Sequence, residues 1–329
     1  MMSKYIGIDI GKEQVDICWL RDPQTGKAKT KTFKNKPEVF PSIHQWLTRQ
    51  TEVSPSHVVV LLEATGVYYE ALSYFLYDQG FNLIVSNPGR AKKFAQSIGL
   101  VHKTDKSDSI MLAKYGFAQR HELIPWKPES VEVRGLKAMM RRLSALEKDC
   151  QREKNRLEAS AISDSSDRVL LSLETMITVL ESEIKALKGD IDSHIDQHPK
   201  LRKNRQLLLT IKGVGEVVAR EMVYLFSAKS FSNAKQVAAY LGLIPRLNES
   251  GAFKGRTTLS KSGPSRIRAK LYLASVCAST HNCHIKAQRD RLIRAGKTKM
   301  QALCAAMRKL VQICFGVIKT QTEYQVQAG

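Results

Sequence analysis

The sequence has 329 residues, of which 52 are Lys or Arg and 31 are Asp or Glu, giving a formal net charge of +21; 43% of its residues are hydrophobic. A fully disordered chain is excluded, because solvated coils carry far fewer apolar side chains. The length suffices for two or three domains, and the positive charge favours an anionic partner. Neither a signal-peptide pattern nor an apolar run of about 18 residues is found, which predicts a cytoplasmic protein without a membrane segment.

The positive charge is concentrated near the C-terminus. Residues 1–200 hold 29 basic and 26 acidic side chains, whereas residues 201–329 hold 23 basic and 5 acidic ones. A charge run is often just a solvated face, but here acids are almost missing from a region patterned as folded helices. Such a region is expected to bind phosphate backbones, with an affinity that falls as salt rises. An acidic membrane surface is the weaker alternative, because no helix pairs a continuous apolar face with a basic one.

Residues 1–125 predict an α/β domain. Strand-like runs separated by turn residues lie at 5–10, 14–20 and 27–33, which predicts an antiparallel meander. Buried strands are expected at 57–62 and 81–85, and helices at 37–49, 67–77, after Pro88 and at 105–118. Hairpin-linked strands followed by alternating helices and strands predict a mixed sheet with helices on its faces.

Residues 126–200 predict an α-helical, coiled-coil-like connector. Apolar residues repeat at spacings of three and four from Leu136 to Cys150 and from Leu173 to Ile191. These heptad-like runs fit an antiparallel hairpin within the chain or a coiled coil between chains, and ordinary amphipathic helices fit equally well. The last region, residues 201–329, is expected to be mainly helical.

Four carboxylates are candidates for a metal site. Asp9 and Glu63 each end a predicted strand, and Asp105 and Asp108 lie three residues apart at a helix start, on one face. Each alone can be an ordinary turn, strand-end or capping residue. If they converge, they repel one another unless a cation neutralises them, and oxygen ligands favour Mg²⁺ or Mn²⁺ over Zn²⁺. Two such ions can hold the attacking and leaving oxygens of a phosphodiester exchange.

Four short segments carry a family resemblance. They are Tyr5–Lys12 (YIGIDIGK), Leu62–Tyr68 (LEATGVY), Asn87–Arg90 (NPGR) and His102–Asp108 (HKTDKSD). In this order they resemble the DEDD transposases of insertion sequences, whose relatives include Piv-type DNA invertases and bridge-RNA-guided recombinases. The resemblance implies that residues 1–125 form an RNase H-like, RuvC-like nuclease domain. It also implies that the four carboxylates are its catalytic metal ligands.

A candidate DNA-binding hairpin lies at residues 207–219 (LLLTIKGVGEVVA). The pattern predicts a helix, a tight turn and a second helix, and backbone N–H groups at a helix start suit a phosphate. Lys212, Gly213 and Gly215 are therefore expected nucleic-acid contacts. A simple corner between helices would need the same glycines for positive φ, and Glu216 weakens the phosphate interpretation.

Residues 242–268 are rich in Gly, Ser and basic side chains and can cradle a phosphodiester. The candidate contacts here are Lys254, Arg256, Lys261, Arg266 and Arg268. In the resembling family a serine precedes a glycine after a Gly-Leu-x-Pro word, which here is Ser250 before Gly251. The implied role is that of a nucleophile forming a covalent phosphoserine; on the residues alone, Ser260 and Ser262 are equally possible.

The sequence thus predicts a DNA transposase or site-specific recombinase using Mg²⁺ or Mn²⁺. Expected partners are double-stranded DNA, a structured guide RNA that the resemblance implies, and further copies of the chain as a dimer or tetramer. The alternatives are a RuvC-like Holliday-junction endonuclease, a Piv-like invertase without guide RNA and a non-catalytic nucleic-acid-binding protein. An actin-like kinase also begins with Gly-Ile-Asp-Ile-Gly, but the second phosphate loop of such kinases is missing.

Overall fold

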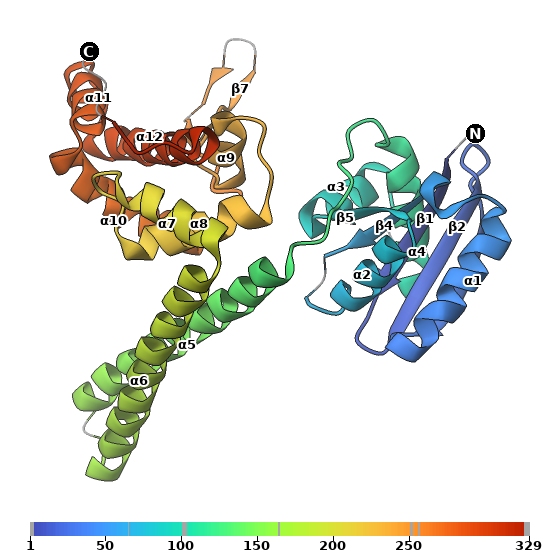
Figure 1. The fold of residues 1–329 in the computed structure, drawn as a ribbon, viewed down its shortest axis with the longest axis horizontal. Coiled ribbons are helices and arrows are strands. Elements are labelled where there is room, and N and C mark those ends of the chain that lie inside the picture. The colour runs from blue at the N-terminus through green and yellow to red at the C-terminus, as the bar shows by residue number, and fades with distance from the viewer. Residues whose placement is uncertain are drawn as a thin grey trace. The chain divides into compact units, whose positions relative to one another are not determined.

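The computed structural model describes residues 3–64, 66–100, 104–163, 165–250, 253–255 and 257–325. Contacts within the chain divide it into two compact units, Met1–Pro128 and Glu129–Gly329 (Figure 1). Each unit has hydrophobic clusters of its own. An α/β first unit and a mostly helical second unit agree with the predicted fold classes.

The described part of the first unit contains a five-stranded mixed sheet with the order β3-β2-β1-β4-β5. Its strands are β1 (Lys4–Ile10), β2 (Gln14–Asp22), β3 (Lys27–Lys34), β4 (Val58–Glu63) and β5 (Asn82–Ser86). β1, β2 and β3 pair antiparallel, while β4 runs parallel to β1 and β5 parallel to β4. The predicted meander and mixed sheet are confirmed.

Helices cover both faces of this sheet. They are α1 (Phe40–Thr51), α2 (Glu70–Asp78), α3 (Pro88–Ser97) and α4 (Asp105–Ala118). α1 and α2 bury Leu47 and Leu72 in one cluster with the β1, β2 and β4 side chains of one face. α3 and α4 bury Ala91 and Leu112 with the other face. A 3₁₀ turn at Pro37–Val39 replaces the start of the first predicted helix.

A glycine lets α4 lie directly against β1. A Cβ atom at Gly7 would stand 2.0 Å from the carbonyl oxygen of Ser109 and 2.3 Å from the backbone nitrogen of Ala113. No side chain fits at such distances. Gly7 therefore sets how closely the helix approaches the strand whose end carries Asp9.

The second unit begins with a long helical hairpin of α5 (Val131–Ile162) and α6 (Asp167–Gln197), shown in Figure 1. The ion pair Lys154–Glu181 (2.6 Å) joins a later part of α5 to an earlier part of α6, and Lys188–Glu147 (3.6 Å) joins an earlier part of α5 to a later part of α6, so the helices are antiparallel. The two heptad-like runs thus pack against each other within the chain. Among the described residues, full burial ends at Cys150 in α5 and resumes at Ile191 in α6.

The remaining helices pack around one core. They are α7 (Pro199–Leu209), α8 (Glu216–Ala228), α9 (Ala234–Tyr240), α10 (Ser265–His281), α11 (Cys283–Arg294) and α12 (Lys299–Thr320). Leu208, Met222, Leu271 and Leu310 are among its completely buried residues. The sequence prediction missed four two-residue strands, β6 (Pro245–Arg246), β7 (Glu249–Ser250), β8 (Phe253–Lys254) and β9 (Thr258–Leu259).

Within the described ranges, α12 alone is long and apolar enough to cross a membrane, judged by length and composition. The sequence prediction did not expect any segment to meet this criterion. Its buried residues, which include Ala302, Leu310 and Cys314, pack into the core of the second unit. α12 is therefore packed as a helix of that core.

Candidate active site and nucleic-acid interface

The strands that carry Asp9 and Glu63 are neighbours in the sheet, as expected. The parallel register of β1 and β4 pairs Ile8 with Leu62, and each carboxylate follows directly. Carboxyl ends of parallel strands meet at one edge of a sheet. Asp9 and Glu63 are both half-buried at that edge.

The N-cap of α4 is neither of its two carboxylates. Thr104 is the N-cap, since its Oγ1 accepts a hydrogen bond from the Ser107 N–H at 3.1 Å, and Ser107 Oγ accepts one from the Thr104 N–H at 2.9 Å. The alternative that Asp105 caps the helix is wrong. Asp105 is exposed and Asp108 half-buried in the first turn, where the helix dipole favours negative charge.

The pKa of Asp9 is raised by its surroundings, which include the other carboxylates. Burial and then, in order of importance, repulsion from Asp108, Asp105 and Glu63 together raise the pKa of Asp9 to about 6. All three predicted partners therefore lie near enough to Asp9 to repel its charged form. A bound cation would relieve this repulsion between carboxylates.

A fifth carboxylate, Asp16, was missed by the sequence prediction. It lies directly opposite Asp9 in the β1–β2 register and also raises the pKa of Asp9. Thr32 on β3 donates a hydrogen bond from Oγ1 to Asp16 Oδ1 at 2.5 Å. The alternation of β2 could have indicated this residue, but only once the register was known.

Asn35 ties together the loops that follow the two carboxylate strands. Its Nδ2 group donates to the carbonyl oxygen of Gly11, after β1, at 2.9 Å and to that of Tyr68, after β4, at 3.2 Å. The backbone N–H of Asn35 donates to the carbonyl oxygen of Glu13 at 2.8 Å. These bonds hold both strand ends to a third point just after β3, and no sequence motif indicated them.

The chemistry of these donors fits a hard divalent cation. Carboxylate oxygens on two strand ends and one helix start are the ligands that Mg²⁺ and Mn²⁺ take. Across the described ranges, however, no three His, Cys, Asp or Glu side chains already stand close enough to hold an ion. Glu63, Asp105 and Asp108 lie near enough to raise the pKa of Asp9. Their side chains would have to rotate before they could hold one ion together with Asp9. Within the same ranges, His281, Cys283 and His284 form no such group either.

In the second unit, the predicted hairpin is formed by α7, a turn and α8. Gly213 has φ of +99°, and a Cβ there would lie 2.4 Å from that of Ala278 on α10. Asn282 donates from Nδ2 to the Lys212 carbonyl oxygen at 3.2 Å. The side chain of Lys212 is exposed, whereas Glu216 at the start of α8 is paired with Arg205 at 2.9 Å. Gly213 thus serves close packing, whereas a Cβ at Gly215 would meet no atom within 4 Å, and the Lys212 side chain stays available to a phosphate.

Two of the predicted phosphate contacts are engaged inside the second unit. Arg266 pairs at 2.9 Å with Glu221, whose side chain is 1% exposed, and Lys270 binds the other Glu221 oxygen at 2.9 Å. Arg268 donates from Nη1 to the carbonyl oxygens of Leu241 and Gly263 at 3.3 and 2.8 Å. These contacts give Arg266 and Arg268 structural roles. Lys261 is exposed, with φ of +54°; Arg256 and the side chain of Lys254 lie outside the described residues.

Ser250 lies on an exposed β-ribbon that extends from the helices of the second unit (Figure 1). β7 pairs with β8 through Ser250 and Phe253, and β6 pairs with β9. Gly251 lies outside the described residues. Ser260 and Ser262 differ from Ser250, because their hydroxyl oxygens are hydrogen-bonded to each other at 2.7 Å in a turn held by Gly242.

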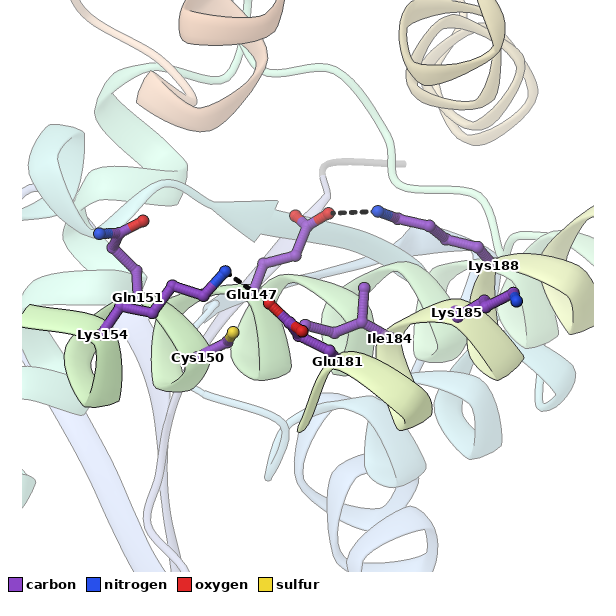
Figure 2. Close-up of a pocket in the computed structure, with 8 residues that line it drawn as sticks. All are labelled: Glu147, Cys150, Gln151, Lys154, Glu181, Ile184, Lys185 and Lys188. Carbon is purple, nitrogen blue, oxygen red and sulfur yellow. Dashed lines mark ion pairs between the residues drawn. The ribbon is translucent and has the colours of Figure 1, made fainter. Parts of the chain in front are cut away.

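A groove of about 450 Å³ lies on the α5–α6 hairpin (Figure 2). Its lining residues are Glu147, Cys150, Gln151, Lys154, Glu181, Ile184, Lys185 and Lys188. The dashed lines in Figure 2 join two of its lysines to its two glutamates. None of the predicted site residues lines this groove.

Comparisons with known families cover both units. A family model described as a transposase matches residues 6–161, and one described as the IS116/IS110/IS902 family of transposases matches residues 205–309. Pilin gene-inverting proteins of Moraxella bovis and Moraxella lacunata are each 30% identical over 328 residues, covering 97% of both chains. The chain belongs to the IS116/IS110/IS902 family of transposases. It is therefore a DNA transposase or recombinase, as predicted.

Other relatives of this transposase match over shorter stretches. An uncharacterized protein of insertion element IS110 from Streptomyces coelicolor is 25% identical over 160 residues, which is 48% of this chain and 38% of that protein. Among solved structures, Thermus thermophilus RuvC in complex with a Holliday junction substrate is 14% identical. It covers 38% of this chain and 99% of its own, with a TM-score of 0.28.

Proposed function

We propose that this transposase cuts and rejoins DNA with Ser250 as nucleophile and divalent cations at the carboxylates. The placement of Asp9 and Glu63 at the ends of neighbouring parallel strands carries the metal part of the proposal. The raised pKa of Asp9 supports it, because a cation relieves repulsion between carboxylates. Asp9, Glu63, Asp105 and Asp108 would hold Mg²⁺ or Mn²⁺. When bound, these ions would supply charge stabilisation to the phosphoryl oxygens. The predicted division into residues 1–125, 126–200 and 201–329 separates this site from a connector and a DNA-binding region.

The proposed step conserves the phosphodiester bond energy. The Ser250 Oγ attacks the scissile phosphorus, one P–O bond forms and the P–O bond to the departing DNA strand breaks. The serine proton passes to solvent, and the leaving oxygen becomes a hydroxyl by taking up a proton. A hydroxyl of the exchanged strand then reverses the reaction and releases the serine.

Substitutions at the two kinds of group test this chemistry. Ser250→Ala is expected to abolish both cleavage and the protein–DNA adduct detected on denaturing gels, whereas Ser260→Ala and Ser262→Ala should retain both. Asp9→Asn, or EDTA, should lower cleavage more than about 100-fold, the upper range for losing a group behind a metal ligand. If Ser250→Ala cleaves DNA as fast as the wild type, the covalent mechanism is wrong, and the protein is an endonuclease of the RuvC kind in which water attacks the phosphate.

DNA inversion is the second candidate function. Similarity to pilin gene-inverting proteins over 97% of the chain favours it. Use of a structured guide RNA distinguishes the candidates, and sequencing the nucleic acid that copurifies with the protein decides between them. One discrete RNA species would support guided transposition, while random fragments would support an invertase that acts without RNA.

We also propose that the chain works in the cytoplasm, at the nucleoid, as a dimer or tetramer. Leu171, Met176 and Val179 on α6 are about half exposed, at 55, 49 and 53%, on the part of the hairpin that buries nothing completely in the described residues. Association of two hairpins would cover this apolar surface. Replacing the three residues by Gln should convert an oligomer to a monomer in light scattering.

A further inference from the structure

The structure points to a second nucleic-acid contact surface on α11 and the turn that follows it. We infer that Lys286, Arg291, Arg294 and Lys297, named here the α11 cation strip, bind the phosphate backbone of the nucleic acid. This inference rests on the proposed function, because it takes nucleic acid as the partner. It concerns residues outside the predicted contacts.

The first argument is the lack of compensating charge. Residues 286–299 contain six basic side chains and one acidic side chain, Asp290. Asp290 is already paired with Arg289 at 2.8 Å. The four strip residues are exposed, and within the described ranges none of them makes an ion pair.

The second argument is that two acids of the helical core, Glu216 and Glu221, are committed elsewhere. Glu221 is shared by Arg266 and Lys270, and Glu216 is bound by Arg205. Arg266, which the sequence placed among the phosphate contacts, is thus neutralised inside the fold. The α11 cation strip, in contrast, keeps its positive charge without an ion pair among the described residues.

Geometry gives the strip a suitable reach. α11 packs into the unit through the fully buried Ile285, so its opposite side faces solvent. Lys286 and Arg294 are eight residues apart, about 12 Å along a helix. This is close to the width of the B-DNA major groove, whose two edges are phosphate backbones. Apart from Ile293 and Met300, exposed 39 and 55%, the surface offers little for a membrane to bury.

Salt dependence of binding tests the inference. The full-length protein in EDTA, where cleavage is blocked, is titrated into labelled duplex DNA and, separately, a hairpin RNA of equal length over a series of salt concentrations. The slope of log K against log salt is negative, and each lost phosphate contact makes it shallower by about 0.9. K286Q/R291Q/R294Q/K297Q should make the slope shallower by about 3.6 and weaken binding at least about tenfold at fixed salt. K286Q/R294Q should show roughly half of the change in slope.

The control removes four exposed cations from β3 and α1 of the first unit, as K27Q/K29Q/K31Q/R49Q. It should change the slope by less than about one unit. A loss confined to the DNA or the RNA arm identifies which backbone the strip binds. An unchanged slope in both arms, or an equal loss in the control, overturns the inference. If the wild-type protein binds neither nucleic acid, the proposed function itself fails.

Discussion

The two units treat charge in opposite ways. In the first, burial and repulsion from neighbouring carboxylates raise the pKa of Asp9 to about 6. In the second, a buried acid such as Glu221 is matched by two cations, while surplus positive charge remains on α11. The contrast teaches that like charges gather at the proposed metal site of the first unit, whereas opposite charges pair inside the core of the second.

Breaking a matched charge should have the largest effect on stability. Glu221→Gln leaves Arg266 and Lys270 beside a neutral group in a buried site, so the free energy of unfolding should fall by about 3–5 kcal/mol. Glu216→Gln is the control, because its side chain is 43% exposed and its loss should cost at most about 1 kcal/mol. Urea unfolding measures both. Equal losses would contradict the distinction between buried and exposed pairs.

The approach of α4 to β1 should be nearly as sensitive. Gly7→Ala places a methyl group against the backbone of Ser109 and Ala113, so overpacking should lower the unfolding free energy by about 3 kcal/mol and reduce cleavage. Gly116→Ala, on the same helix, meets Leu61 Cβ at 3.5 Å and should be tolerated. Thermal unfolding and cleavage assays of the pair check this. A stable, active Gly7→Ala protein would mean that the helix need not lie so close.

Loss of the Asn35 bonds should have a smaller, more local effect. Asn35→Ala frees the loops after β1 and β4, which should lower stability by about 1–2 kcal/mol and weaken Mn²⁺ binding roughly tenfold. Asp22→Ala removes comparable turn contacts to Gln24 and Thr25 at the other end of the sheet. It should destabilise without changing Mn²⁺ affinity, as calorimetric titration will measure. Equal affinities in both variants would deny Asn35 a positioning role.

The pH dependence of stability should show the smallest effect. Because the pKa of Asp9 is raised in the folded state, the folded protein binds more protons than the unfolded one between about pH 4 and 6. Without metal, the contribution of Asp9 to stability should therefore decrease as pH rises through this window. Comparing urea unfolding of wild type and Asp9→Asn in EDTA isolates the contribution. Identical pH profiles would contradict the crowding of carboxylates around Asp9.

Long periodic elements were predictable from the sequence, and short ones were not. The helix at 105–118 was predicted with the bounds of α4, because its polar start and apolar run are both local signals. The helix expected from residue 67 begins at Glu70, since Gly66 takes a positive φ in the preceding turn. The ribbon of β6 to β9 was missed, because two-residue strands show no alternation.

The candidate site was predictable where it depends on element ends. Asp9 and Glu63 each end a strand, and parallel pairing brings such residues together. Asp16 depends on strand register, and Asn35 on contacts with residues up to 33 positions away. The structural role of Arg266 depends on Glu221, 45 residues earlier in the chain. Contacts between residues that lie far apart in the chain produce no periodic pattern in its sequence.

The β-ribbon that carries Ser250 has a consequence for the control of reactivity. Each of its two pairings spans two residues per strand, and a two-stranded ribbon has little stability of its own. The fold therefore does little to fix the direction of the Ser250 hydroxyl. In the proposed reaction, the nucleophile is aimed by the bound DNA rather than by the protein alone. In such a recombinase the nucleophile is oriented only when the correct DNA is bound, so DNA bound in another way is not cut.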